Sequence, residues 1–154
     1  MEVIELNPHS EEVISVIEDI DTLMNSLYPA ESNQLLSAEE LLSDDVYFIG
    51  MHEGEELAGC GAIVHKRDDG VYGELKRIYV KPKYRGKGIS KSIINALIKY
   101  AKKERFHAIR LETGVKQPEA IHLYTRFGFK KRCEFGSYQF DPLSVYMELD
   151  LTHE

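Results

Sequence analysis

The sequence predicts an α/β fold, a sandwich in which helices cover both faces of a central mixed, mostly antiparallel sheet. Three observations support this fold class. The chain has 154 residues with ordinary apolar and charged fractions, so it fits a single domain over 1–154 with its own core. Three strand patterns in the first half are joined by short turns, as in an antiparallel meander. A strand–helix–strand pattern in the second half predicts two parallel strands with a right-handed crossover.

Two helical patterns lie at the N-terminal end. Ser10 is a typical N-cap for a helix that ends near Tyr28, because Pro29 disfavours helical backbone in the residue before it. Ser37 and Glu40 match a capping box, which predicts a second, short helix. The first helix carries apolar residues at helical spacing, namely Val13, Ile17, Ile20, Met24 and Leu27.

Turn residues and hydrophobic periodicity predict the remaining elements. Glu53-Gly54 and Asp68-Asp69-Gly70 mark turns between strands of the meander. Pro118 suits the first turn of the last helix, and Gly128 suits its C-terminal cap. The expected strands are 46–51, 57–65, 71–80, 108–113, 129–135 and 144–151, and the expected later helices are 88–106 and 118–127.

The composition argues against several classes of function. A net charge of −7 disfavours nucleic-acid binding, which needs a surplus of Lys and Arg. No signal-peptide pattern is present and no apolar run approaches the ~20 residues that span a bilayer, so we expect a cytoplasmic protein without a membrane partner. Cys60 and Cys133 form no CxxC motif or Cys/His cluster, so we expect reduced thiols and no metal site. Cys60 lies in an apolar run and is expected to be buried.

One segment is basic against this acidic background. From Lys76 to Lys91 the chain carries seven basic residues at the end of a strand, in a turn and at the start of a helix. Free N–H groups at a helix N-terminus bind anions, and Gly86 and Gly88 allow a pyrophosphate to approach the backbone. The spacing matches neither a Walker loop nor the GxGxxG loop of dinucleotide-binding folds. The pattern therefore predicts an anionic ligand at this turn.

The turn resembles the acyl-CoA loop of the GNAT family of N-acetyltransferases. Arg85, Gly88 and Ser90 match the family pattern Arg/Gln-x-x-Gly-x-Gly/Ala, with Ser in place of Gly or Ala at the last position. A second block, from Gln117 to Phe129, resembles the family's Asn-x-x-Ala-x-x-x-Tyr-x-x-x-Gly-Phe, with Gln in place of Asn. The resemblance covers nearly the whole chain. It implies a GNAT-like sandwich and an acetyltransferase that uses acetyl-CoA as its co-substrate.

The resemblance also implies roles for individual residues. Backbone groups of Ile78 and Val80 would pair with the pantetheine arm as an added strand, and the Val80 N–H would stabilise the oxyanion. Lys87 and Lys91 would support the pyrophosphate electrostatically, and Tyr124 would protonate the departing thiolate. The residues expected to bind the cofactor are Ile78, Tyr79, Val80, Arg85, Gly86, Lys87, Gly88, Ile89, Ser90, Lys91, Gln117 and Tyr124.

Removal of a proton from the acceptor amine is the larger of the two proton transfers. An alkyl amine with a pKa of ~10 is neutral in about one molecule per thousand at pH 7, whereas a thiolate whose conjugate acid has a pKa of ~8.5 leaves readily. Glu74 lies six residues before Val80, where some family members carry a catalytic Glu, and Glu112 on the neighbouring strand is the alternative base. Either carboxylate needs apolar surroundings or a water relay for this role.

Two segments are candidates for the acceptor site. Tyr28 and Glu31 follow the first helix, and Tyr138 lies between the last two strands. Glu31 and Asp141 are suited to bind an ammonium group and the tyrosines to wall a pocket, although ordinary turn chemistry explains the same residues equally well. A small-molecule amine is the first hypothesis for the acceptor. A protein amine and a non-catalytic acyl-CoA sensor are the alternatives, and a homodimer is a common assembly among similar proteins.

Overall fold

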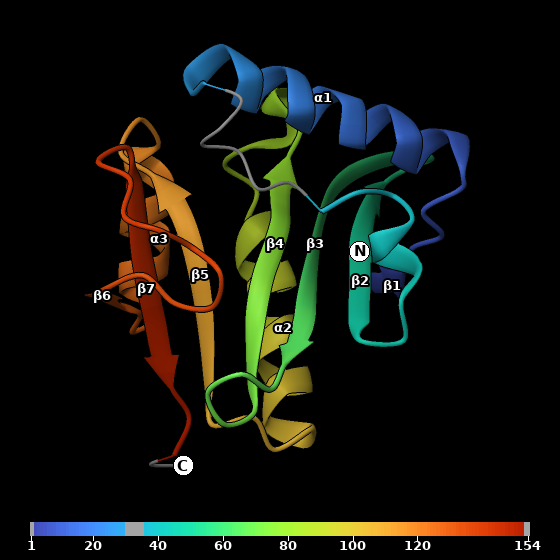
Figure 1. The fold of residues 1–154 in the computed structure, drawn as a ribbon. Helices are drawn as coiled ribbons and strands as arrows, with labels where there is room; N and C mark the ends of the chain where they lie inside the picture. The colour runs from blue at the N-terminus through green and yellow to red at the C-terminus, as the bar shows by residue number, and fades with distance from the viewer. Residues whose placement is uncertain (1, 30–35, 153–154) are drawn as a thin grey trace.

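The computed structural model describes residues 2–29 and 36–152. These residues form a seven-stranded sheet with the strand order β1-β2-β3-β4-β5-β7-β6 (Figure 1). Neighbouring strands are antiparallel except β4 and β5, which are parallel, as the sequence predicts. The strands are β1 Val3–Glu5, β2 Val46–Glu53, β3 Glu56–Lys66, β4 Tyr72–Val80, β5 Ala108–Gly114, β6 Lys130–Arg132 and β7 Ser144–Asp150.

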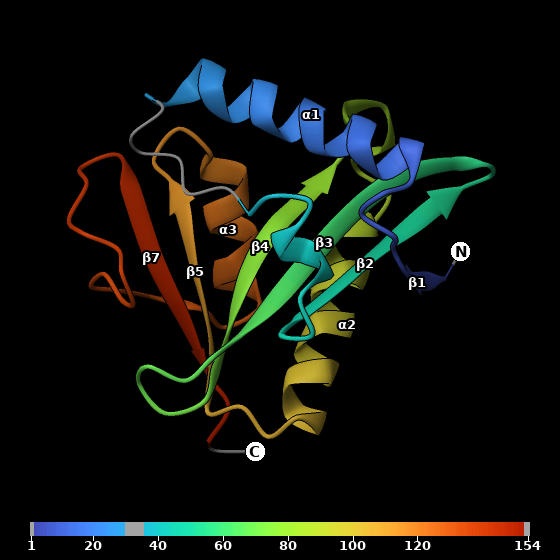
Figure 2. The same ribbon diagram turned by 45° about the vertical axis from the view of Figure 1, so that its right-hand side comes forward.

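Helices cover both faces of this sheet. α1 (Glu11–Leu27) crosses one face, while α2 (Ile89–Lys103) and α3 (Pro118–Arg126) lie on the other (Figures 1 and 2). Ser10 caps α1, because its Oγ accepts a hydrogen bond from the Val13 N–H at 3.4 Å. The predicted mixed α/β sandwich is therefore confirmed. Among the described residues, no helix has both the length and the apolar character that crossing a membrane requires.

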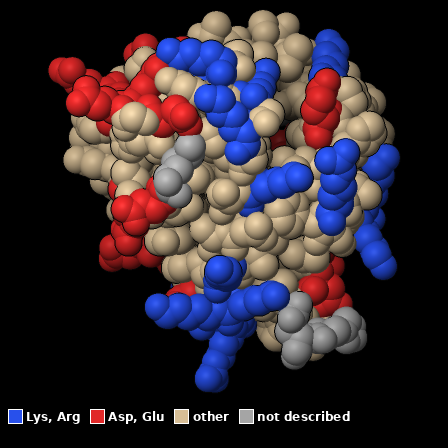
Figure 3. All heavy atoms as spheres, turned by 180° about the vertical axis from the view of Figure 1, so that it is seen from behind, with Lys and Arg blue, Asp and Glu red and all other residues tan. Residues whose placement is uncertain are grey.

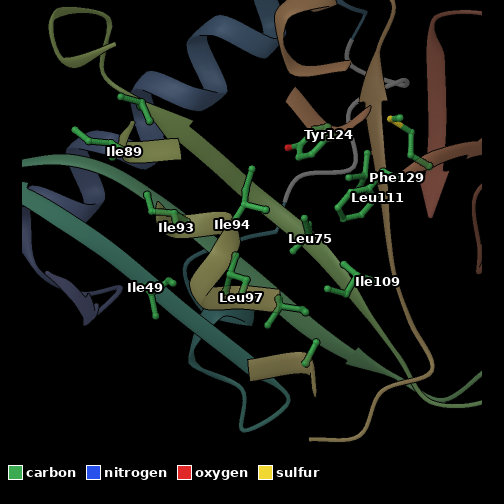
Figure 4. Packing of buried hydrophobic residues seen from close by; sticks show 14 of the residues in the cluster. Ile49, Leu75, Ile89, Ile93, Ile94, Leu97, Ile109, Leu111, Tyr124 and Phe129 are labelled. Atoms are coloured by element: carbon green, nitrogen blue, oxygen red, sulfur yellow. The ribbon is translucent and has the colours of Figure 1, made fainter. Parts of the chain in front are cut away.

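Two hydrophobic cores lie between the sheet and the helices. On the α2 side, Ile93 and Leu97 are fully buried against sheet residues such as Ile109 (Figure 4). On the other face, a smaller core joins α1 to β2 and β3 and includes Cys60, which is buried as expected. Burial raises the pKa of the Cys60 thiol to about 12, so this group stays protonated at neutral pH.

Two helical predictions differ from the structure. The helix predicted over 88–106 ends at Lys103, and Arg105 then adopts a left-handed backbone with a φ of 61°. The capping box predicted at Ser37 does form, but only a 3-10 turn follows it (η2, Glu40–Leu42). Local sequence signals fix where these helices begin better than where they end.

Two edge strands are too short for hydrophobic periodicity to define. β6 covers only the middle of the strand predicted over 129–135. The sequence does not predict β1, which pairs with β2 over three residues. Both strands lie at the edges of the sheet, where one neighbour is enough to hold them.

β4 separates from β5 part of the way along the sheet. Their parallel ladder ends at the pair Glu74–Arg110, and β4 then carries a β-bulge in its register against β3. Arg77 lies in this bulge with a φ of 58°, a conformation that residues with a Cβ rarely adopt. Its buried guanidinium donates to Asp21 Oδ1 on α1 at 2.6 Å and to the Leu36 carbonyl at 2.8 and 3.0 Å. These contacts hold the bulge in place.

The substitution Leu97→Ala tests the larger core. Leu97 belongs to α2 and is fully buried against the sheet, so its truncation leaves a cavity and should lower the free energy of unfolding by about 2–5 kcal/mol. Leu42→Ala, at a site that is 48% exposed, is the matched control and should change this free energy by less than about 0.5 kcal/mol. Urea denaturation of both variants measures the difference, and equal losses would contradict this description of the core.

Candidate active site

The separation of β4 from β5 opens a cleft of about 650 Å³. Its walls include the ends of both strands, Ser90 at the start of α2 and Tyr124 of α3. The second half of α1, including Met24, also lines it. Because α1 lies on one face of the sheet and α2 and α3 on the other, the cleft runs between the strands from one face to the other.

The turn before α2 has the geometry of an anion site. Gly86 and Gly88 both have a φ of 81°, in the left-handed region that favours glycine. Gly88 is the N-cap of α2, and no side chain of the described residues caps the helix there. A Cβ at either glycine would meet nothing within 4 Å, so the backbone is open to a ligand. The free N–H groups and the helix dipole make this position electropositive.

Carboxylates of the β2–β3 hairpin fix the basic turn. Glu56 accepts hydrogen bonds from Lys83 Nζ at 2.6 Å, from Lys81 Nζ at 3.2 Å and from the Tyr84 hydroxyl. These donors lower the pKa of Glu56 to about 2, with Lys83 as the largest cause. The face that carries α2 and α3 shows several groups of Lys and Arg side chains although the chain is acidic overall (Figure 3). The turn is therefore held in position before a ligand arrives.

Val80, at the end of β4, presents backbone groups to the cleft. The Lys81 N–H donates to the Ala58 carbonyl on β3 at 2.8 Å. Because successive residues of a strand direct their backbone groups to opposite edges, the Val80 N–H points away from β3 and toward the separated β5. The Val80 carbonyl accepts from Arg85 Nε at 3.2 Å. The Val80 N–H thus faces the cleft, at a position where β5 no longer pairs with β4.

Tyr124 forms part of the opposite wall. It is 6% exposed, and burial raises the pKa of its phenol, so the hydroxyl keeps its proton at neutral pH. The ring packs edge-on against Phe129, with 5.6 Å between the ring centroids. Within the described residues, no group forms a hydrogen bond with the Tyr124 hydroxyl. A protonated phenol at this wall is a suitable acid for a group in the cleft.

Glu112 is a carboxylate on the β5 wall of the cleft. Ser144 Oγ donates to its Oε2 at 2.7 Å. Burial raises the pKa of Glu112 and outweighs the hydrogen bond from Ser144 and the charge of Lys76, which both lower it. A carboxylate with a raised pKa is a better proton acceptor than an exposed one.

Glu74 lies in a neighbouring pocket of about 630 Å³, which shares Lys76 with the cleft. The Tyr138 hydroxyl donates to Glu74 Oε2 at 2.6 Å, and Lys76 Nζ lies 3.3 Å from the same oxygen. Lys66 Nζ lies 3.9 Å from Oε1. Glu74 is 3% exposed, so these contacts compensate a buried charge. They also tie the loop between β6 and β7 to the sheet.

Tyr28 connects the end of α1 to the turn between β5 and α3. Its hydroxyl donates to Gln117 Oε1 at 3.2 Å and accepts from the Lys116 N–H at 3.1 Å. A Cβ at Gly114 would lie 1.8 Å from this hydroxyl, so only glycine fits beneath the ring. Tyr28 therefore fixes the position of the β5–α3 turn relative to the C-terminal end of α1.

The cleft brings together many of the residues expected from the sequence. The residues of the predicted site that line it are Ile78, Tyr79, Val80, Arg85, Ser90, Glu112, Gln117 and Tyr124. Gly86, Lys87, Gly88, Ile89 and Lys91 belong to the adjoining turn and the first turn of α2. Tyr28 lies beside the cleft, Glu74 and Tyr138 line the neighbouring pocket, and Glu31 lies outside the described residues.

Sequence reasoning missed three contributors to the cleft. Arg77 belongs to the basic stretch from Lys76 to Lys91, but its contact with α1 does not follow from the sequence. Lys116 lines the cleft immediately before the Gln117 block, and Ser144 binds Glu112 from β7. The strand pairing of β5 with β7, which the sequence does not specify, creates the Ser144 contact.

The chain is similar to known acetyltransferases over nearly its whole length. The profile of the acetyltransferase (GNAT) family matches residues 14–129. The IAA acetyltransferase of Azospirillum brasilense is 39% identical over 145 residues, which cover 94% of each chain. The uncharacterized N-acetyltransferase YsnE of Bacillus subtilis is 34% identical over 138 residues, which cover 88% of this chain and 90% of the relative.

Solved structures show the same fold. A protein from Klebsiella pneumoniae assigned as an acyl-CoA N-acyltransferase is 35% identical, with a TM-score of 0.82 and 97% of each chain covered. PaiA N-acetyltransferase of Thermoplasma acidophilum, in complex with coenzyme A, has a TM-score of 0.74 at 24% identity, with 97% of this chain and 98% of PaiA covered. Because PaiA is only 24% identical, its similarity to this chain concerns the fold alone. From its profile, its relatives and its fold, the chain belongs to the GNAT family and is an acyl-CoA-dependent N-acetyltransferase.

Proposed function

We propose that the chain transfers an acetyl group from acetyl-CoA to the primary amine of a small molecule, by direct attack within a ternary complex. The observation that carries this proposal is the cleft between β4 and β5. Residues from both faces of the sheet line this cleft, so the two substrates can approach the same point from opposite faces. PaiA and an aminoglycoside 6'-N-acetyltransferase of the same fold have structures with coenzyme A. The relative from Azospirillum brasilense, named IAA acetyltransferase, supports a small-molecule acceptor.

In this proposal acetyl-CoA binds from the face that carries α2 and α3. The N–H groups from Arg85 to Ser90 hold the pyrophosphate, since this turn is open and electropositive. Lys87 and Lys91 add positive charge. The pantetheine arm takes the place of a strand partner beside Ile78 and Val80, where β5 has separated from β4. The thioester carbonyl then accepts a hydrogen bond from the Val80 N–H.

The transfer forms one bond and breaks another. The lone pair of the neutral amine attacks the thioester carbonyl carbon, a C–N bond forms, and the charge on the oxygen is stabilised by the Val80 N–H. When the tetrahedral intermediate collapses, the C–S bond breaks and the sulfur takes the electron pair. A carboxylate has by then accepted the proton that turns the acceptor's ammonium into the attacking neutral amine. The Tyr124 hydroxyl gives its proton to the thiolate, and the second proton, which the nitrogen loses as the amide forms, returns to the tyrosinate through solvent. The products are an amide and free CoA.

The geometry favours Glu112 over Glu74 as the carboxylate that accepts this proton. Glu112 lines the cleft and has a raised pKa, whereas Glu74 faces the neighbouring pocket, where Tyr138 and Lys76 hold it. Deprotonation of an amine with a pKa of ~10 costs about 4 kcal/mol at pH 7, so the base makes a large contribution to the rate. Glu74 remains the second candidate, acting through a water relay.

The substitution Arg85→Glu tests the site for acetyl-CoA. Acetyl-CoA at about 100 times its Kd should stabilise the native protein by about 2.7 kcal/mol and raise its melting temperature. Arg85→Glu should abolish this rise, because it places a carboxylate at the phosphate turn. Lys99→Glu, with the same charge change on the exposed side of α2, should keep it. A rise of equal size in both variants would remove the turn from the binding site.

The substitution Tyr124→Phe tests the acid. The expected result is a fall in kcat of about 10- to 100-fold, because the thiolate then leaves without a proton donor. Affinity for CoA and the melting temperature should change little, since no described group hydrogen-bonds with this hydroxyl. Steady-state kinetics and calorimetry with CoA measure the two effects. An unchanged kcat would exclude Tyr124 from the mechanism.

The substitutions Glu112→Gln and Glu74→Gln identify the base. Glu112→Gln should lower kcat/KM by about 100-fold or more for an alkyl amine. The loss should be much smaller for an acceptor that is already neutral at pH 7, because that acceptor has no proton to lose before attack. Glu74→Gln should show no such dependence on the acceptor. The opposite pattern would assign the base to Glu74.

A further inference from the structure

More positively than negatively charged side chains line the cleft. Four basic side chains and two carboxylates contribute to its walls. Arg77 is bound to α1, Arg85 contacts the Val80 carbonyl at the phosphate turn, and Lys76 contacts Glu74 and Tyr138. Lys116 differs from these three, since in the described part of the chain it forms no ion pair with a carboxylate. Among the described residues, Lys116 is therefore a cation of the cleft without a carboxylate partner.

Contacts with Tyr28 define the position of Lys116. The Tyr28 hydroxyl accepts from the Lys116 backbone N–H, and the Lys116 ammonium lies 5.9 Å from the centroid of the Tyr28 ring. Tyr28 is 7% exposed and is itself fixed against Gly114, so it holds this turn rigidly. Glu112 lies on the same strand as Gly114 and lines the same cleft as Lys116. Glu112 and Lys116 therefore lie at the same end of the cleft, beside Tyr28.

An apolar wall completes this end of the cleft. Leu23, Met24 and Leu27 in the last turns of α1 line the cleft, and each is only partly buried. Partly exposed apolar side chains beside a polar site favour a ligand that covers them. The acceptor end therefore combines a carboxylate, an ammonium group and an apolar surface.

We infer that the acceptor is a free amino acid with an apolar side chain, whose carboxylate binds Lys116 while its amine faces Glu112. This inference rests on the proposed transfer reaction and names its substrate class. A zwitterion supplies both charges that the site needs, and its side chain covers the wall on α1. A polyamine or an aminoglycoside would instead bring further ammonium groups toward Lys116 and Lys76. A lysine side chain within a protein has no carboxylate next to its amine.

Leucine and isoamylamine form the sharpest pair of probes, because they differ only by the carboxylate. With the wild-type protein and acetyl-CoA, kcat/KM from thiol release should be at least about 10 times higher for leucine. Lys116→Gln should reduce this ratio by about 10-fold through a higher KM for leucine, and Lys116→Glu should reverse the preference. The Kd of CoA, measured by calorimetry, should stay within about twofold in both variants. Lys99→Gln, at an exposed site on α2, is the control and should keep the wild-type ratio.

Failure of this inference is distinguishable from failure of the proposed function. Thiol release that is faster with isoamylamine or spermidine than with leucine would overturn the inference and leave the transfer reaction standing. Equal losses for leucine and isoamylamine in Lys116→Gln would also overturn it, because Lys116 would then act on something other than the carboxylate. Absence of any heat on adding CoA to the wild-type protein would overturn the proposed function itself.

Discussion

The separation of β4 from β5 after the Glu74–Arg110 pair is the constraint on which the site depends. A strand in the middle of a sheet normally satisfies its backbone groups on both sides, and unpaired buried groups are costly. Beyond this pair, β3 is the one described strand that pairs with β4, and the other edge of β4 faces a cleft. The buried Arg77 side chain holds the bulge that accompanies the separation, and the same side chain binds α1. Strand geometry and the acceptor side of the site are therefore linked.

Two groups of charged residues lie in different parts of this acidic protein, one at the basic turn before α2 and one around Glu74 and Glu112. The β2–β3 hairpin places Glu56 against the basic turn before α2, so the turn is ordered while its backbone N–H groups stay open to an anion. On the other face of the sheet, Glu74 is bound by Tyr138 and Lys76 in the neighbouring pocket, whereas Glu112 lines the cleft. In the proposed function, the anionic co-substrate and the amine would thus meet different sets of charges. This separation favours one orientation of each substrate.

Much of the fold and of the phosphate turn is predictable, because both follow from local patterns. Ser10 caps α1, and the Arg85–Ser90 motif combines a turn with a helix start. The choice between Glu74 and Glu112 does not follow from local patterns. Both residues point to the same face of the sheet, but Glu74 lies in the last paired position, whereas Glu112 lies two residues beyond the pair, where the strands have separated. The length of that ladder decides which of these two residues lines the cleft, and tertiary packing sets this length.

A crystal structure with bound CoA tests the central claim most directly. The account predicts that the pantetheine arm lies between β4 and β5, with its amides paired to the backbone of Ile78 and Val80 and its pyrophosphate on the turn from Arg85 to Ser90. The sulfur should lie within reach of the Tyr124 hydroxyl. CoA bound in the neighbouring pocket beside Glu74, or β4 and β5 paired along their full length around it, would contradict the account.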